Sequence, residues 1–199
     1  MDADTKELVY ALYGISEGAR ALPTVLRSLA VAGLSPESAT VDGNTQQIKY
    51  LCLVWPSIIL QRCIIHIQRQ GLSWCRRNPK RTDAKHLRKI FLRICEVKTS
   101  LQARRFITDV VAWEHRFGLA IDQSSDRGWV FGDLLRARSM LLKALPDMFH
   151  YVANSHIPSS TNSLEGYFSR LKEHYRHHRG LAIHHRDAYF RWYFKLVPG

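Results

Sequence analysis

Long apolar runs are missing from this sequence of 199 residues. Its most apolar stretches end early, because Gln61 follows residues 58–60 and Glu114 follows residues 110–113. A helix needs about 20 apolar residues to cross a bilayer, so we expect no membrane span. The N-terminus has neither the basic start nor the apolar core of a secretion signal, which predicts an intracellular protein.

Cysteine is scarce as well, with four residues in the whole chain: Cys52, Cys63, Cys75 and Cys95. Four cysteines suffice for two disulfides in a secreted protein. Without a secretion signal we expect reduced thiols instead. The sequence also has no repeat of 20 to 50 residues, which excludes solenoids and propellers.

Acidic residues are outnumbered, with 17 Asp and Glu against 29 Lys and Arg, which gives a net charge of +12 and a pI near 9.9. Residues 51–105 carry 13 basic and two acidic side chains, and residues 165–199 carry seven and three. A solvated helix face normally mixes both signs. Charge of one sign predicts a polyanionic partner, most simply nucleic acid.

Five of the ten histidines lie among arginines in residues 172–186. His174 and His178 are four residues apart, a spacing that suits a metal site on a helix. No carboxylate or cysteine completes such a set, so phosphate contact is the preferred interpretation.

The first part of the chain alternates between strand and helix patterns. Strand formers fill residues 7–15, after a turn at residues 2–6, and short strands are predicted at 38–41 and 57–60. Apolar spacing predicts a helix over 22–30, and Asn44 is expected to cap a second helix that runs to Trp55. Alternation of this kind predicts a parallel part of a mixed sheet.

The hydrophobic pattern changes at Cys63, because from there apolar residues recur at intervals of three and four residues. We predict a mostly helical block over residues 63–153, with loops near 78–80 and 123–126. A long helix follows residues 158–160 and ends at Gly180, and a short helix covers 187–196.

Two acids are candidates for chemistry. Asp42 follows a predicted strand at its carboxyl end, where α/β proteins place functional groups. The simpler interpretation is a turn, since Asp-Gly is a common turn dipeptide. Glu165 also has a structural alternative, a capping box with Asn162 as the N-cap.

Cys63 and His66 form half of a zinc-binding pattern. Cys75 has no second partner at ligand spacing. Taken alone, the pair predicts a buried thiol and a histidine with an ordinary hydrogen bond.

The order of these pieces is more specific than any one of them. Asp42-Gly43 is followed by the segment QRCIIH at 61–66, a helical block, TNSLEGYFSRLK at 161–172 and HRGL at 178–181. This order resembles the Mutator-type insertion-sequence transposases, over essentially the whole chain from about residue 7.

The resemblance implies an α/β fold, a ribonuclease H-like mixed sheet with a large helical insertion between the second and third acids of an Asp-Asp-Glu triad. Asp42 would be the second acid and Glu165 the third, both as catalytic metal ligands, with Cys63 and His66 as the C-x-x-H motif. Two Mg²⁺ or Mn²⁺ ions would support cleavage and transfer of DNA strands. The implied partners are transposon ends and target DNA, with a homo-oligomer as a further expectation, and the implied location is the bacterial cytoplasm at the nucleoid.

The family's first Asp lies on the first strand of its sheet, and this chain is expected to begin after it. The expected domains are 1–62 as the N-terminal part of the core, 63–157 as a basic helical insertion and 158–199 as the helices that complete the core. The alternative function is a DNA-binding remnant without catalysis. The residues expected to bind DNA are Arg62, Arg69, Arg76, Arg77, Lys80, Arg81, Arg170, Lys172, Arg176 and Arg179.

Overall fold

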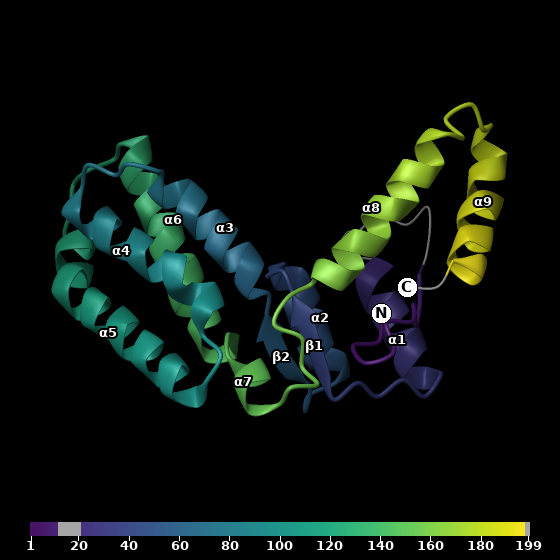
Figure 1. The fold of residues 1–199 in the computed structure, drawn as a ribbon, viewed down its shortest axis with the longest axis horizontal. Helices are drawn as coiled ribbons and strands as arrows, with labels where there is room; N and C mark the ends of the chain where they lie inside the picture. Colours follow the sequence, from purple (N-terminus) through teal and green to yellow (C-terminus); the bar gives the residue numbers. More distant parts are fainter. Residues whose placement is uncertain (12–20, 198–199) are drawn as a thin grey trace. The chain divides into compact units, whose positions relative to one another are not determined.

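The computed structural model describes residues 1–11 and 21–197, and helices dominate this part of the chain (Figure 1). In chain order the elements are α1 (Ala21–Val31), β1 (Ser38–Val41), α2 (Thr45–Val54), β2 (Ile59–Arg62), α3 (Ile64–Cys75), α4 (Thr82–Arg93), η1 (Ile94–Glu96), α5 (Ser100–Asp122), α6 (Trp129–Ala144), η2 (Leu145–Asp147), α7 (His150–Ala153), α8 (Asn162–Arg176) and α9 (Ile183–Leu196). No helix among these is long and apolar enough to cross a membrane.

The expected ribonuclease H-like mixed sheet is wrong. Within the described residues, β1 and β2 pair in parallel with each other and form a sheet of two strands, and the rest is mainly helical. Residues 7–11 are not a strand, and residues 12–15 of that prediction lie outside the described residues. The predicted turn at residues 2–6 does form, with the Asp2 carboxylate accepting hydrogen bonds from the amides of Asp4 and Thr5.

The helices follow their sequence signals more closely. Residue Gly33, with a φ of +92°, lies just past α1, and its N–H donates to Ala30 while Leu34 N–H donates to Leu29. This is a Schellman end, which glycine permits because it has no Cβ. The predicted Asn44 cap of α2 is confirmed, since its side chain accepts from the amides of Gln46 and Gln47.

Two compact units divide the described chain. Unit 1 comprises residues 1–37, 44–58 and 161–199, and unit 2 comprises residues 38–43 and 59–160. All four cysteines lie in the described part, and none forms a disulfide.

Unit 2 holds the two strands and a helical core. Fully buried side chains of α3, α4, α5 and α6 meet in one apolar cluster, including Ile67, Phe91, Val110 and Leu134. The buried amide of Gln61 connects β2 to this helical part, because its Nε2 donates to the Met148 carbonyl at 2.7 Å. A buried amide with its hydrogen bonds made fixes the two segments against each other.

Charged groups also join α5 to α6. The Arg138 guanidinium, 14% exposed, binds the carboxylates of Glu114 and Asp122. These carboxylates raise the pKa of Arg138 above its ordinary value. A nearly buried cation with two carboxylates stays charged, and the pairing fixes how the two helices face each other.

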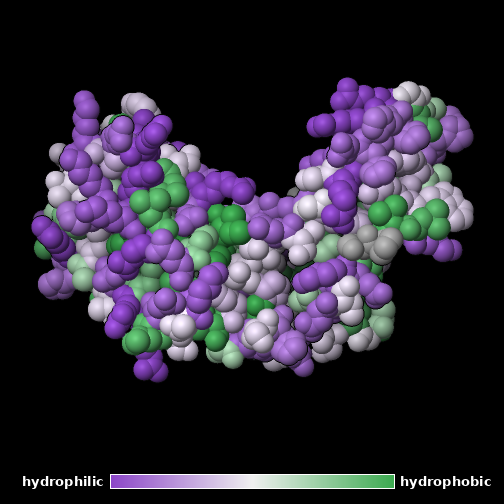
Figure 2. All heavy atoms as spheres, viewed as in Figure 1, coloured by the Kyte–Doolittle hydropathy of each residue, from purple (hydrophilic) through white to green (hydrophobic). Residues whose placement is uncertain are grey.

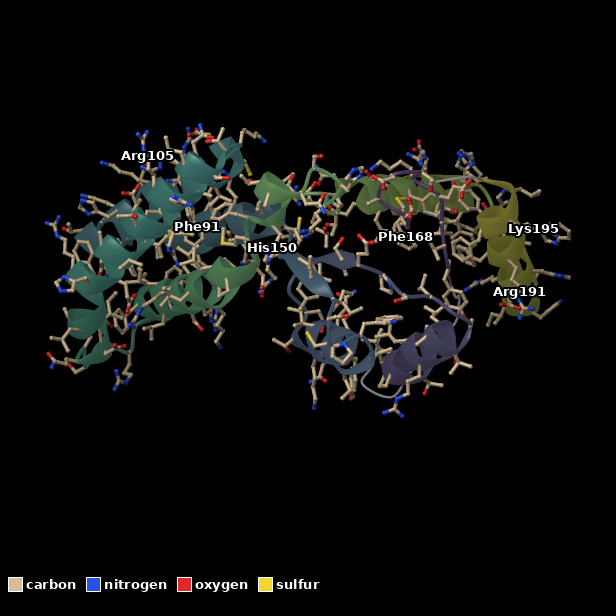
Figure 3. All side chains as sticks on the ribbon, turned by 90° about the horizontal axis from the view of Figure 1, so that it is seen from below. Phe91, Arg105, His150, Phe168, Arg191 and Lys195 are labelled. Atoms are coloured by element: carbon tan, nitrogen blue, oxygen red, sulfur yellow. The ribbon has the colours of Figure 1, made fainter. Side chains whose placement is uncertain are left out.

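Unit 1 contains an aromatic cluster between α8 and α9. Tyr167 is fully buried and packs edge to face on Tyr193, with Leu171 and Phe190 buried beside them. Tyr167 and Leu171 are four residues apart on α8 and so share one face of that helix. Phe168, labelled on α8 in Figure 3, is the residue after Tyr167 and is 36% exposed.

Candidate functional site

The two strands bring their carboxyl ends to one edge in unit 2. Their parallel register pairs Ser38 with Ile59 at one end and Val41 with Arg62 at the other. Beyond the last pair, Cys63 N–H donates to the Val41 carbonyl at 2.8 Å. Asp42 and Cys63 are therefore the first residues past their strands at the same edge, the place where parallel sheets usually hold functional groups.

Cys63 and His66 are in direct contact. Cys63 is the N-cap of α3 and is completely buried, and His66 lies one turn further on. The distance from His66 Nδ1 to Cys63 Sγ is 3.1 Å. Thiolate and imidazole are ligands suited to zinc. The contact therefore sets two metal-ligating side chains next to each other at the carboxyl edge.

The backbone around Cys63 is hydrogen-bonded to a segment from later in the chain. The Ile64 N–H donates to the Ser159 carbonyl at 3.0 Å, and the Thr40 hydroxyl donates to the Pro158 carbonyl at 2.7 Å. Both bonds lie within unit 2. Residues 158–159, which precede α8 in the chain, are thereby hydrogen-bonded to Thr40 of β1 and to Ile64, two residues after β2.

Asp42 is exposed, and its neighbour across the edge is a buried cation. Arg62 is 8% exposed, and its guanidinium lies against Gly43, where an added Cβ would be 2.0 Å from Nη2. Burial lowers the pKa of Arg62, while the negative charges of Asp147 and Asp42 act in the opposite direction. Gly43 also has a φ of +112°, so both backbone and space favour glycine there.

Glu165 lies in the first turn of α8, in unit 1, whereas Asp42 belongs to unit 2. The predicted capping box with Asn162 is wrong, since Thr161 is the N-cap and Asn162 is the first helical residue. The Thr161 hydroxyl instead donates to the Glu165 carboxylate at 2.6 Å. The carboxylate is thus oriented by its own helix start, and it is partly buried.

The ten cations predicted to bind DNA fall into two groups. Three are partly or fully withdrawn from solvent: besides Arg62, Arg76 binds Asp133 at 3.0 Å and Arg81 binds Asp83 at 2.8 Å. Seven are exposed, namely Arg69, Arg77, Lys80, Arg170, Lys172, Arg176 and Arg179. Cations on the surface are the ones able to reach phosphates.

Two features were missed at the sequence level. Trp129 is 70% exposed and stacks with Arg76, whose guanidinium carbon lies 3.7 Å from the ring centroid. The second is the position of Arg62 beside Asp42. Neither had a local signal, because each pair joins segments that are far apart in the chain.

No family model, no curated protein and no solved structure matches the chain. The functional assignment therefore depends on the residues described above.

Proposed function

We propose that this chain binds DNA and takes part in metal-dependent cleavage and joining of DNA strands, as transposases do. The observation that supports this most is the pairing of β1 with β2, which sets Asp42 and the Cys63–His66 pair at one carboxyl edge. The same residues carry the resemblance to Mutator-type transposases. Glu165, as the further acid, is assigned from that resemblance.

This reaction uses oxygen ligands that hold divalent ions, and it does not require a nucleophilic side chain. Water or a 3′-hydroxyl attacks the phosphorus, the P–O bond to the leaving 3′-oxygen breaks, and the attacking oxygen loses its proton. Divalent ions, when bound, would lower the barrier by activating the attacking oxygen and stabilising the leaving one. The exposed Asp42 carboxylate suits Mg²⁺ or Mn²⁺, which prefer oxygen and often take one or two carboxylates with substrate phosphates.

Manganese binding tests this assignment directly. In the full chain, titration of Mn²⁺ followed by electron paramagnetic resonance is expected to show binding that Asp42→Asn and Glu165→Gln each weaken. Matched controls are Glu37→Gln, an exposed acid before β1, and Glu173→Gln, an exposed acid later on α8. If Asp42→Asn binds Mn²⁺ as tightly as wild type does, Asp42 is not a metal ligand.

A second candidate function is DNA binding without catalysis. The position of Arg62 favours it, because a buried guanidinium beside Asp42 already supplies a positive charge there. DNA binding and nicking of supercoiled plasmid, each with Mg²⁺ or with EDTA, separate the two functions. Nicking that requires Mg²⁺ and is lost in Asp42→Asn supports the first, and metal-independent binding without nicking supports the second.

A further inference from the structure

A groove runs between α4 and α5 in unit 2. One hollow of about 280 Å³ is lined by Lys89 and Arg93 of α4 and by Arg116 and Phe117 of α5. A second hollow of about 240 Å³ is lined by Arg93 and Arg105. Arg93 and Asp109, which form an ion pair, line both hollows, so the two adjoin along α4 and α5 and are here together called the α4–α5 groove.

The rim of the groove is mainly positive. Its acids are Asp109, which binds Arg93, and Glu96 at the end of the second hollow. Lys89, Arg105 and Arg116 make no ion pair with any residue that the structure describes. Figure 3 labels Arg105 on α5 with its side chain directed away from the helix. Lys89, Arg105 and Arg116 therefore leave uncompensated charge along the groove.

The floor of the first hollow is aromatic. The Phe117 ring lies 5.5 Å from the His86 ring and 5.8 Å from the Trp113 ring, and Arg116 stacks on it at 5.0 Å. Trp113 is buried, so Phe117 and His86 are the rings that reach the surface. On the face seen in Figure 2, unit 2 is mostly hydrophilic, with apolar residues in small groups.

A row of cations above an aromatic floor suits a chain of phosphates that carries flat bases. Arg105 and Arg116 are eleven residues apart on α5, or about 16 Å along the helix, a length over which a nucleic acid strand carries several phosphates. Aromatic rings accept unpaired bases of any sequence by stacking. An acidic protein would match the positive charge of the rim, but it has no bases to stack on the aromatic rings.

We propose that the α4–α5 groove binds a single strand of nucleic acid, with phosphates on Lys89, Arg105 and Arg116 and an unpaired base on Phe117. The inference rests on the proposed function only in taking nucleic acid as the partner. None of these four residues is among the cations that the sequence indicated for DNA binding.

The test is binding of a fluorescein-labelled oligothymidine to the full chain, followed by fluorescence anisotropy. The variant Lys89→Gln/Arg116→Gln removes two groove cations. The control Lys85→Gln/Arg104→Gln removes two exposed cations from the same helices outside the groove. We expect the groove variant to bind roughly tenfold more weakly and to lower the salt slope by about 1.4, with a clearly smaller change in the control.

A second variant, Phe117→Leu, tests the stacking. It is expected to weaken binding of the single strand and to leave binding of a duplex of the same length unchanged, with the fold checked by circular dichroism. Equal losses in the groove and control variants would overturn the groove while leaving the proposed function intact. Absence of nucleic acid binding by wild type would contradict the proposed function itself, and polyglutamate bound through Lys89 and Arg116 in place of the strand would assign the groove to an acidic protein.

Discussion

Arg62 is a buried cation whose charge interacts with that of Asp42. Its guanidinium is desolvated, and its Nε is buried without a hydrogen-bond partner among the described residues. A buried cation in this state costs free energy, which the nearby charges of Asp42 and Asp147 offset. It also repels any second cation that approaches Asp42.

Arg62→Met is therefore expected to raise the Mn²⁺ affinity of the chain severalfold, because it removes the competing positive charge and keeps most of the side-chain volume. Stability is expected to change by no more than about 1 kcal/mol, since the lost attraction to Asp147 and Asp42 and the removed cost of burying the guanidinium oppose each other. The measurement is a Mn²⁺ titration combined with urea unfolding. An unchanged or lower affinity in a folded variant would show that Arg62 does not limit metal binding at Asp42.

The free energy of unfolding is expected to fall at alkaline pH, because two buried groups keep their protons in the folded chain. Burial raises the pKa of the Cys75 thiol from 9.0 to about 12, and burial raises the pKa of Tyr151 from 10.0 to about 12. Between these unfolded and folded values the unfolded chain has lost protons that the folded chain keeps. The free energy of unfolding is thus highest below pH 9 and falls as pH rises toward 12.

Urea unfolding at pH 8, 9.5 and 10.5 measures this dependence. Cys75→Ala is expected to make the decline shallower between pH 9 and 10, where buried thiols contribute more than buried tyrosines, although the cavity lowers stability at every pH. Cys52→Ala, which removes an exposed thiol, is the control. A wild-type free energy of unfolding that stays constant to pH 10.5 would contradict the buried, protonated state of Cys75.

At the scale of elements, α3 and α4 approach each other through Gly71. A Cβ at this position would lie 2.2 Å from the ring of Phe91, which is completely buried. Gly71→Ala is expected to destabilise the chain by about 1–2 kcal/mol, because overpacking exceeds the gain in helix propensity. Gly132→Ala in α6 meets nothing within 4 Å and is expected to stabilise by up to about 1 kcal/mol. Urea midpoints of the two variants test this. A shift of the same sign in both would contradict the close contact of Gly71 with Phe91.

Helices were predicted well because their signals are local. The apolar spacing over 22–30 and the Asn44 cap each act within a few residues, and the structure has α1 and α2 where these signals lie. β2 was predicted at 57–60 and runs from Ile59 to Arg62. The bounds of β2 depend on its pairing with β1, and the local sequence around β2 carries no information about that pairing.

At the scale of the whole molecule, the sheet was the part that sequence patterns misjudged. Strand propensity at residues 7–15 indicated a further strand, but residues 7–11 have no strand partner. A strand needs a neighbour for its backbone hydrogen bonds, and propensity does not supply one. The candidate residues at the strand ends were found from residue type and order, while the cation beside Asp42 required the register of two strands.

Net charge is a property of the whole chain, and it predicts how DNA binding depends on salt. If the seven exposed cations of the predicted set all contact phosphates, the slope of log K against log salt is roughly −6 for duplex DNA. The triple variant Arg69→Gln/Arg77→Gln/Lys80→Gln is expected to make this slope less steep by about 2.7.

A matched triple variant carries the same change in net charge on exposed residues outside that set: Lys6→Gln/Arg27→Gln/Lys49→Gln. Anisotropy titrations from 50 to 300 mM salt compare the two. Counterion release counts only cations that displace ions from the phosphates, so a localised interface gives a large change for the first variant and a small one for the second. Equal changes would mean that DNA responds to the charge of the whole chain, and that the basic block at residues 51–105 has no special part in binding.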